Sequence, residues 1–198
     1  MANIYVIAGP PGIGKSTSGG SVIPLGISIL DPDLIAHLYK KQGYADYKDI
    51  GNLKFNELLK KELFSENDFA IELNLGFQSH YDFVRSVKSF NSKNTINVVL
   101  FYTDDLELCL KRAEIRHQSG LHLVDPDTIR EMYQSTVPLL IENFSLVTTL
   151  YALNVTAHEL PKICIEFSKS ANELILADEQ PNWISRELKS FLKMQLHH

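Results

Sequence analysis

The chain has 198 residues, a length that fits a single domain, and its 44% hydrophobic and 22% charged residues are typical of a globular protein. The net charge of -5 argues against a surface built for nucleic acid or for an anionic membrane, and no apolar run is long enough to cross a bilayer. The two cysteines, Cys109 and Cys164, lie far apart and indicate neither a disulfide framework nor a zinc site; with no visible leader segment, we expect a cytoplasmic protein in which both are buried.

The first part of the sequence alternates short strands with helices. Asn3–Ala8 is a β-branched and aromatic run that predicts a buried strand, and a Gly-Pro turn and a short helix follow it. Residues 26–30 predict a second strand. Asp31 and Pro32 then have the residue types of an N-cap and a first helical position, so a helix is expected to begin there.

The middle of the chain continues this alternation. The helix that begins at Pro32 carries Leu34 and Leu38 on one face, and the polar residues 43–51 predict a loop. The same patterns then predict a helix at 55–63, a strand at 69–73, a helix at 81–91 and a strand at 96–102.

The last third begins with two acids after the strand at 96–102. Asp104, with Glu107 three residues on, has the pattern of a capping box. Asp104 and Asp105 also resemble the acid that follows a strand in ATPases. We favour the capping interpretation. The remaining expected elements are a helix to about residue 117, a helix from Pro126, a strand at 146–153, a hairpin of 162–167 with 173–177, and a helix at 183–194.

Strands that alternate with helices predict parallel βαβ units and an open sheet covered on both faces. We therefore predict an α/β fold, a three-layer αβα sandwich with a mainly parallel sheet. Residues 1–198 are expected to form one domain, in which residues 160–198 add a β-hairpin and a helix. Ligands bind at the carboxyl ends of the strands in such sheets, so catalytic groups should directly follow strands.

The stretch GPPGIGKS fits the phosphate-binding pattern G-x-x-x-x-G-K-[ST] in full, between a strand and a helix. In that pattern backbone N–H groups cradle phosphate oxygens, Lys15 reaches the β- and γ-phosphates, and the Ser16 hydroxyl ligates Mg²⁺. The residues expected to bind the nucleotide are Gly9, Pro10, Pro11, Gly12, Ile13, Gly14, Lys15, Ser16 and Thr17.

Acids near the ends of two strands are candidates for chemistry. Asp33 follows the second strand, where a kinase needs a carboxylate to orient an acceptor hydroxyl and take its proton; a favourable charge in the first helical turn is the alternative. Asp31 is better explained as a cap. Glu72 interrupts an apolar strand, which favours a place beside metal or substrate over an exposed sheet edge.

Two arginines and the loop after them are further candidates. Arg112 and Arg116 are four residues apart and share a helix face, from which they could neutralise the charge of a transferring phosphoryl group; a solvated basic face is the alternative. Residues 116–126 form a candidate lid over the nucleotide, and His122 and Arg130 are weaker candidates.

Taken in order, these motifs resemble the zeta-toxin-like P-loop kinases, in particular their compact "predicted ABC-type ATPase" branch, over nearly the whole chain. GPPGIGKST resembles the branch's GPNGAGKST-like loop, DPDLIA its N-P-D-x-I-A stretch, and FAIELN its acid-bearing strand F-x-x-E-T-T. The other positions that carry the resemblance are Arg112, Arg116, Gly120, His122, Val124, Pro126, Tyr133, Asn154, Pro181 and Trp183.

The resemblance implies ATP- and Mg²⁺-dependent phosphorylation of a small molecule, which in zeta toxins is a UDP-activated amino sugar. It places the family's base at Asp33, its strand acid at Glu72, and its phosphate arginine at Arg112 or Arg116. An antitoxin-like protein is a candidate partner. The sequence departs from the family at Met132, at Leu73 and Asn74 after the strand acid, and at 153–155, which touch lid and substrate positions more than the phosphate cradle.

The sequence thus predicts a P-loop kinase that phosphorylates a hydroxyl of a small molecule. A nucleotide hydrolase or switch is the first alternative, although no NKxD-type guanine motif is present. A module that binds nucleotide but has lost transfer is the second.

Overall fold

One seven-stranded sheet organises the computed structural model, which describes residues 1–119 and 124–197. Its strands stand in the order β2-β3-β1-β4-β5-β6-β7. They are β1 (Asn3–Ala8), β2 (Ser28–Leu30), β3 (Phe69–Glu72), β4 (Thr95–Tyr102), β5 (Thr149–Asn154), β6 (Lys162–Ser168) and β7 (Glu173–Leu176). The strands β1 to β5 pair in parallel, whereas β6 and β7 are antiparallel additions at one edge. The predicted mainly parallel sheet with a C-terminal hairpin is confirmed.

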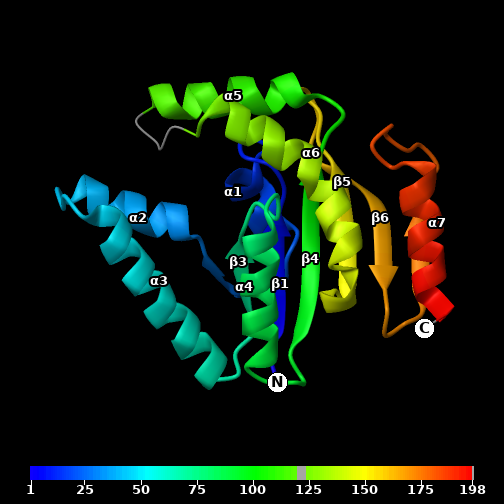
Figure 1. Cartoon of the computed structure of the whole chain (residues 1–198), viewed down its shortest axis with the longest axis horizontal. Helices are drawn as coiled ribbons and strands as arrows, with labels where there is room; N and C mark the ends of the chain where they lie inside the picture. Colours follow the sequence, from blue (N-terminus) through cyan, green and yellow to red (C-terminus); the bar gives the residue numbers. More distant parts are fainter. Residues whose placement is uncertain (120–123, 198) are drawn as a thin grey trace.

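Helices follow most of the strands and lie on both sides of the sheet (Figure 1). They are α1 (Lys15–Ser18), α2 (Pro32–Lys41), α3 (Tyr47–Phe64), α4 (Gln78–Ser89), α5 (Leu106–Gln118), α6 (Pro126–Glu142) and α7 (Arg186–Met194). Short 3₁₀ turns occur at η1 (Gly19–Ser21), η2 (Phe144–Leu146) and η3 (Gln195–His197). Within the described residues, no helix combines the length and apolarity that a membrane span requires.

Successive side chains along the strands point to opposite faces of the sheet and belong to two separate hydrophobic cores. On β1, Ile4, Val6 and Ala8 belong to the larger core, whereas Ile7 belongs to the smaller one. Helices α3, α4, α6 and α7 complete the larger core, and the loop after β1 together with α5 closes the smaller one. Both cysteines are buried and free, as expected. These two helical layers around one sheet confirm the predicted three-layer fold.

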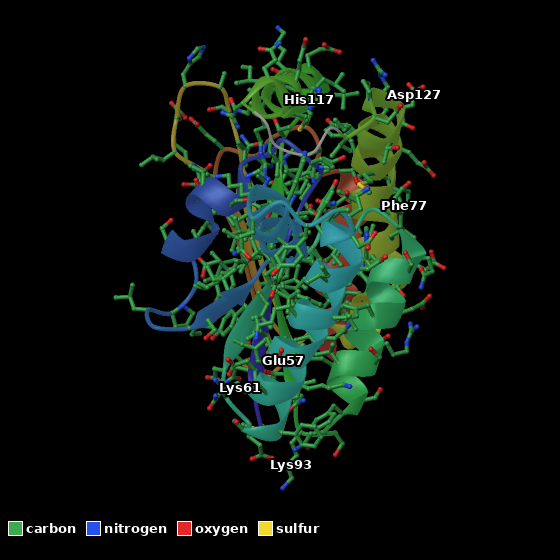
Figure 2. The ribbon with its side chains drawn as sticks, turned by 90° about the vertical axis from the view of Figure 1, so that its left-hand side faces the viewer. Glu57, Lys61, Phe77, Lys93, His117 and Asp127 are labelled. Carbon is green, nitrogen blue, oxygen red and sulfur yellow. The ribbon has the colours of Figure 1, made fainter. Side chains whose placement is uncertain are left out.

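Side-chain caps fix where the helices α2, α5, α6 and α7 begin. The Asp31 carboxylate accepts from the N–H groups of Asp33 and Leu34 at 2.9 and 3.0 Å, as the cap prediction required. Asp125 likewise accepts from the N–H of Asp127 at 2.8 Å. Figure 2 shows Asp127, Phe77 and His117 at one end of the molecule and Lys93 at the other.

The capping role predicted for Asp104 is wrong. The N-cap of α5 is Asp105, whose side chain accepts from the N–H of Leu108 at 3.1 Å. Both carboxylate oxygens of Asp104 instead accept backbone N–H groups of Asn182 and Trp183, at 2.8 and 2.7 Å. Asp104 therefore ties the C-terminal segment to the end of β4, and the same contacts leave little reason to regard it as an ATPase acid.

Helices α2 and α3 form a helical arm that stands beside the sheet at the β2 edge (Figure 1). Helix α3 begins at Tyr47, inside the segment predicted as a loop. The two helices approach closely: a Cβ added at Gly51 would lie 2.7 Å from the Cα of Ala36. Because α2 packs on α3 rather than on the sheet, Leu34 and Leu38 of its apolar face stay 53% and 50% exposed.

Candidate active site

The loop between β1 and α1 has the shape of a phosphate cradle that leans on the rest of the fold. Gly9 has φ +136° and Gly12 φ +81°, and an added Cβ at either would meet a backbone carbonyl oxygen at 2.2 Å, that of Phe101 for Gly9 and that of Cys109 for Gly12. These two glycines are therefore required for packing the loop on β4 and α5. The α-helix that follows has only four residues, so the loop's own N–H groups must supply most of any phosphate binding.

Lys15 is buried and directed back onto its own loop. Its Nζ donates to the carbonyl oxygens of Gly9 and Pro10, at 2.8 and 3.2 Å, and to Oδ1 of Asn74 at 2.8 Å. Burial lowers the pKa of Lys15 to about 8, and the nearby carboxylate of Glu72 opposes that change. Lys15 thus has acceptors in place of phosphate oxygens and would exchange them on binding nucleotide.

Ser16 and Glu72 meet across the mouth of the loop, where the Ser16 hydroxyl donates to Oε1 of Glu72 at 2.9 Å. Burial raises the pKa of Glu72, while Lys15 works in the opposite direction. Hydroxyl and carboxylate oxygens are ligands that suit Mg²⁺, which in nucleotide sites takes its other ligands from phosphates and water. Within the described residues, no group of three or more His, Cys, Asp or Glu side chains is placed to hold a metal ion by itself.

A cleft of about 150 Å³ brings the predicted acids to this loop. It is lined by Lys15, Asp31, Pro32, Asp33, Glu72, Leu73, Asn74 and His80. Burial raises the pKa of Asp31 although two N–H groups hold its carboxylate. The structure therefore places Lys15, Asp33 and Glu72 around one hollow, at the carboxyl ends of β1, β2 and β3.

Two residues in this cleft were not found from the sequence. Asn74, which departs from the family's threonine, holds Lys15 through its side chain and accepts from the N–H of Gly9 through its backbone oxygen. His80 accepts the N–H of Phe77 on Nδ1, and burial, with Lys15 nearby, lowers its pKa. In the neutral ring the proton is then on Nε2, which makes His80 a hydrogen-bond donor at the cleft. No local pattern distinguishes either residue, since each depends on a partner in another element.

The two predicted arginines differ in their surroundings. The guanidinium of Arg112 donates to the carbonyl oxygens of Ile13 and Thr156, at 3.2 and 3.4 Å, so it braces the phosphate loop. Burial is the largest cause of the lowered pKa of Lys15, and Arg116 is near enough for its positive charge to lower that pKa further. The candidate lid at 116–126 lies partly, and His122 wholly, outside the described residues.

Comparison with known proteins gives structural matches alone: no family model and no curated protein matches the chain. A chain of the AvrRxo1-ORF1:-ORF2 complex with ATP matches with a TM-score of 0.68 at 10% identity, over 98% of this chain and 64% of that one. A chain of the PezAT chromosomal toxin–antitoxin system of Streptococcus pneumoniae matches at 0.64 and 17%, over 98% and 84%. A candidate kinase from Chloroflexus aurantiacus matches at 0.51 and 15%, over 67% and 78%.

The matches and the strand order together show an α/β fold of the P-loop type. Within that class the chain has the fold of the zeta-toxin-like kinases, which the order of the sequence motifs had indicated. The chain spans 64% of the length of the AvrRxo1 chain that it matches.

Proposed function

We propose that the chain is an ATP-dependent phosphotransferase of the zeta-toxin-like kinase family that phosphorylates a hydroxyl group of a small molecule. The observation that carries this proposal is one cleft in which the phosphate loop and Lys15 face Asp33 and Glu72. A kinase needs a carboxylate beside the transferred phosphate to orient the acceptor hydroxyl and take its proton, and Asp33 at the start of α2 supplies it.

The residues 9–17 are proposed to bind the triphosphate of ATP. Their N–H groups would contact phosphate oxygens, and the Lys15 ammonium would leave Asn74 and its own loop carbonyls for the β- and γ-phosphates. Mg²⁺ would be held by the Ser16 hydroxyl with Glu72 close by, and would supply positive charge against the phosphates.

The residues of this site would promote phosphoryl transfer mainly by positioning the acceptor hydroxyl and the γ-phosphate. The acceptor oxygen forms a bond to the γ-phosphorus as the bond between that phosphorus and the β–γ bridging oxygen breaks, so ADP leaves. The Asp33 carboxylate takes the proton of the acceptor hydroxyl. Lys15 and Arg116 neutralise the charge that spreads over the transferred group, and Arg112 keeps the loop in place.

The acceptor and a protein partner belong to this proposal as well. A UDP-activated amino sugar is the acceptor that the family resemblance implies. The AvrRxo1 and PezAT matches come from a two-component complex and a toxin–antitoxin system, which supports an antitoxin-like protein as a partner of this chain. Such a partner would act most directly by covering the cleft.

The test is incubation of the protein with γ-labelled ATP, Mg²⁺ and a fractionated metabolite extract that includes UDP-amino sugars. We expect one fraction of small molecules to gain label. Asp33→Asn should keep ATP binding and lose transfer by about 10²–10⁴-fold, because the amide cannot take the proton.

Lys15→Ala is the companion variant, and ATP should no longer raise its melting temperature. Label released mainly as inorganic phosphate without any acceptor would instead identify a hydrolase. Tight ATP binding with no turnover on any fraction would identify a module that has lost transfer. Undiminished transfer by Asp33→Asn would remove Asp33 from the role of base.

A further inference from the structure

A second cavity, of about 250 Å³, lies between the two helices of the helical arm. Its lining includes His37 and Lys40 of α2, with Tyr47 and Lys48 of α3. Pro32 and Asp33 line both this cavity and the cleft of Lys15, so the two hollows meet at the start of α2. We propose that this cavity is the acceptor subsite and that it binds the phosphate group of a small phosphorylated sugar or polyol; the inference rests on the proposed kinase function.

One face of α2 runs from the proposed base into the cavity. Asp33, Ala36, His37 and Lys40 are spaced at i, i+3, i+4 and i+7, so they lie along one side of the helix. A rise of 1.5 Å per residue places Lys40 about 10 Å along the axis from Asp33. A molecule whose phosphate contacts Lys40 can therefore present a hydroxyl several bonds away to Asp33.

The far end of the cavity concentrates positive charge. Within the part of the chain that the structure describes, neither Lys40 nor Lys48 is in an ion pair; the Lys40 Nζ lies 5.7 Å from the ring centre of Tyr47. Lys48 is in the first turn of α3, where the helix dipole disfavours a cation. The N-cap of α3, Asp46, makes no side-chain hydrogen bond to the helix, so the first N–H groups keep their capacity for an anion.

Size and charge together select the ligand. A cavity of about 250 Å³ is just below the range of about 300–1,000 Å³ typical for drug-sized ligands, so a single phosphorylated sugar fits better than a nucleotide sugar. The carboxylate in the lining, Asp33, is at the end that faces the phosphate loop. This arrangement puts the anionic group of the acceptor far from the γ-phosphate and puts the hydroxyl of the acceptor beside the γ-phosphate.

The test is calorimetric binding to the full chain that has first been saturated with Mg²⁺ and a non-hydrolysable ATP analogue, which fills the phosphate loop. The probes are ribose 5-phosphate, glucose 6-phosphate and glycerol 3-phosphate, each against its unphosphorylated parent, with UDP-N-acetylglucosamine for comparison. We expect at least one sugar phosphate to bind more than about tenfold tighter than its parent. Lys40→Gln with Lys48→Gln should remove about tenfold or more of that affinity, since two charged contacts are lost.

The control is Lys41→Gln with Lys61→Gln, which removes the same charge from the same two helices outside the cavity; Lys61 lies far along α3 in Figure 2. It should bind the sugar phosphate as the unchanged protein does. Equal losses in the two double variants, equal binding of phosphates and parents, or no binding by any sugar phosphate would overturn the inference. Binding is measured without turnover, so this test is independent of the kinase proposal. If the protein transfers phosphate to an acceptor and the rate does not depend on Lys40 and Lys48, the kinase proposal holds and the proposed subsite is wrong.

Discussion

The helical arm stands at the β2 edge of the sheet, whereas the C-terminal clasp lies at the ends of the interior strands β4 and β5, and the two regions use their side chains in opposite ways. The clasp consists of Tyr102, Asp104, Tyr133, Asn154 and Trp183. The Tyr102 and Tyr133 rings stack with centroids 4.9 Å apart, Trp183 packs edge-on to Tyr102 at 5.2 Å, and its Nε1 donates to Asn154 at 3.1 Å. Here the hydroxyls of Tyr102 and Tyr133, both carboxylate oxygens of Asp104 and Nε1 of Trp183 each have a hydrogen-bond partner. The arm instead leaves two lysines and a carboxylate lining a cavity.

Burial acts on titratable groups in both regions with different consequences. Beside the arm it lowers the pKa of Lys15 to about 8 and raises the pKa of Glu72, so both move toward neutral pH. In the clasp it raises the pKa of Tyr102 and of Tyr133, which moves them further from neutral pH. The same physical cause, burial, thus brings the pKa values of Lys15 and Glu72 toward neutral pH and keeps Tyr102 and Tyr133 of the clasp uncharged.

The largest effect should come from breaking the clasp. Trp183→Ala removes an edge-on aromatic contact and a hydrogen bond, and we expect the free energy of unfolding to fall by about 2–3 kcal/mol, less than for a fully buried tryptophan. The affinity for ATP at a permissive temperature should be unchanged. Chemical denaturation and ATP titration measure the two quantities, and a matching loss of ATP affinity would show that the clasp and the cleft are not separate.

The second prediction disturbs the arm instead. Gly51→Ala pushes a Cβ onto the Cα of Ala36, so α2 must shift and carry Asp33 with it. We expect phosphoryl transfer to fall by about tenfold or more while stability changes by only about 1 kcal/mol, because overpacking is partly offset by better helix propensity. Gly20→Ala is the control, since its Cβ would meet Ile29 at an ordinary 3.6 Å. Steady-state kinetics with unaltered transfer in Gly51→Ala would contradict a positioning role for the arm.

The smallest effect concerns pH. With the pKa of Lys15 lowered to about 8, its ammonium is half titrated near pH 8 in the free protein and is largely lost by pH 9. ATP affinity should therefore weaken roughly eightfold between pH 7.5 and pH 9 as the cation titrates. Stability without nucleotide should move the other way: the buried charge is a cost below pH 8 that disappears as pH rises from about 8 toward 10.5.

Lys15→Arg is the control for this prediction, because arginine stays charged over the range. Its ATP affinity should show a flatter profile in the same titration. A flat profile for the unchanged protein would mean that Lys15 keeps its ammonium in the free protein above pH 8.

The elements that local chemistry specifies were predicted well from the sequence. The phosphate loop needs glycines and a lysine at fixed positions, and the cap at Asp31 needs its two neighbours alone, so both are visible in a short stretch. The strands β1 and β4 are buried on both faces and read as continuous apolar runs. The site residues Lys15, Asp33 and Glu72 follow from the rule that ligands bind at the carboxyl ends of such strands.

What the sequence missed depends on distant partners. Asp104 has the residue type of a cap, yet its partners are 78 and 79 positions away. The first turns of α3 look like a polar loop because Gly51 packs against Ala36 of α2, whereas the apolar residues that enter the larger core, Phe55, Leu59 and Leu63, come further along the helix. The exposure of Leu34 and Leu38 likewise follows from where α2 packs and not from its spacing.

The pairing of Asp104 with the backbone of residues 182 and 183 also sets an order of events during synthesis. A nascent chain that has emerged as far as residue 180 contains every parallel strand and the phosphate loop. In that chain the Asp104 carboxylate still lacks its two backbone partners, and the Tyr102 ring, which can already stack on Tyr133, still lacks the edge-on contact with Trp183. The contacts of the clasp are thus completed late, because the backbone of residues 182 and 183 is synthesised after the loop between β1 and α1.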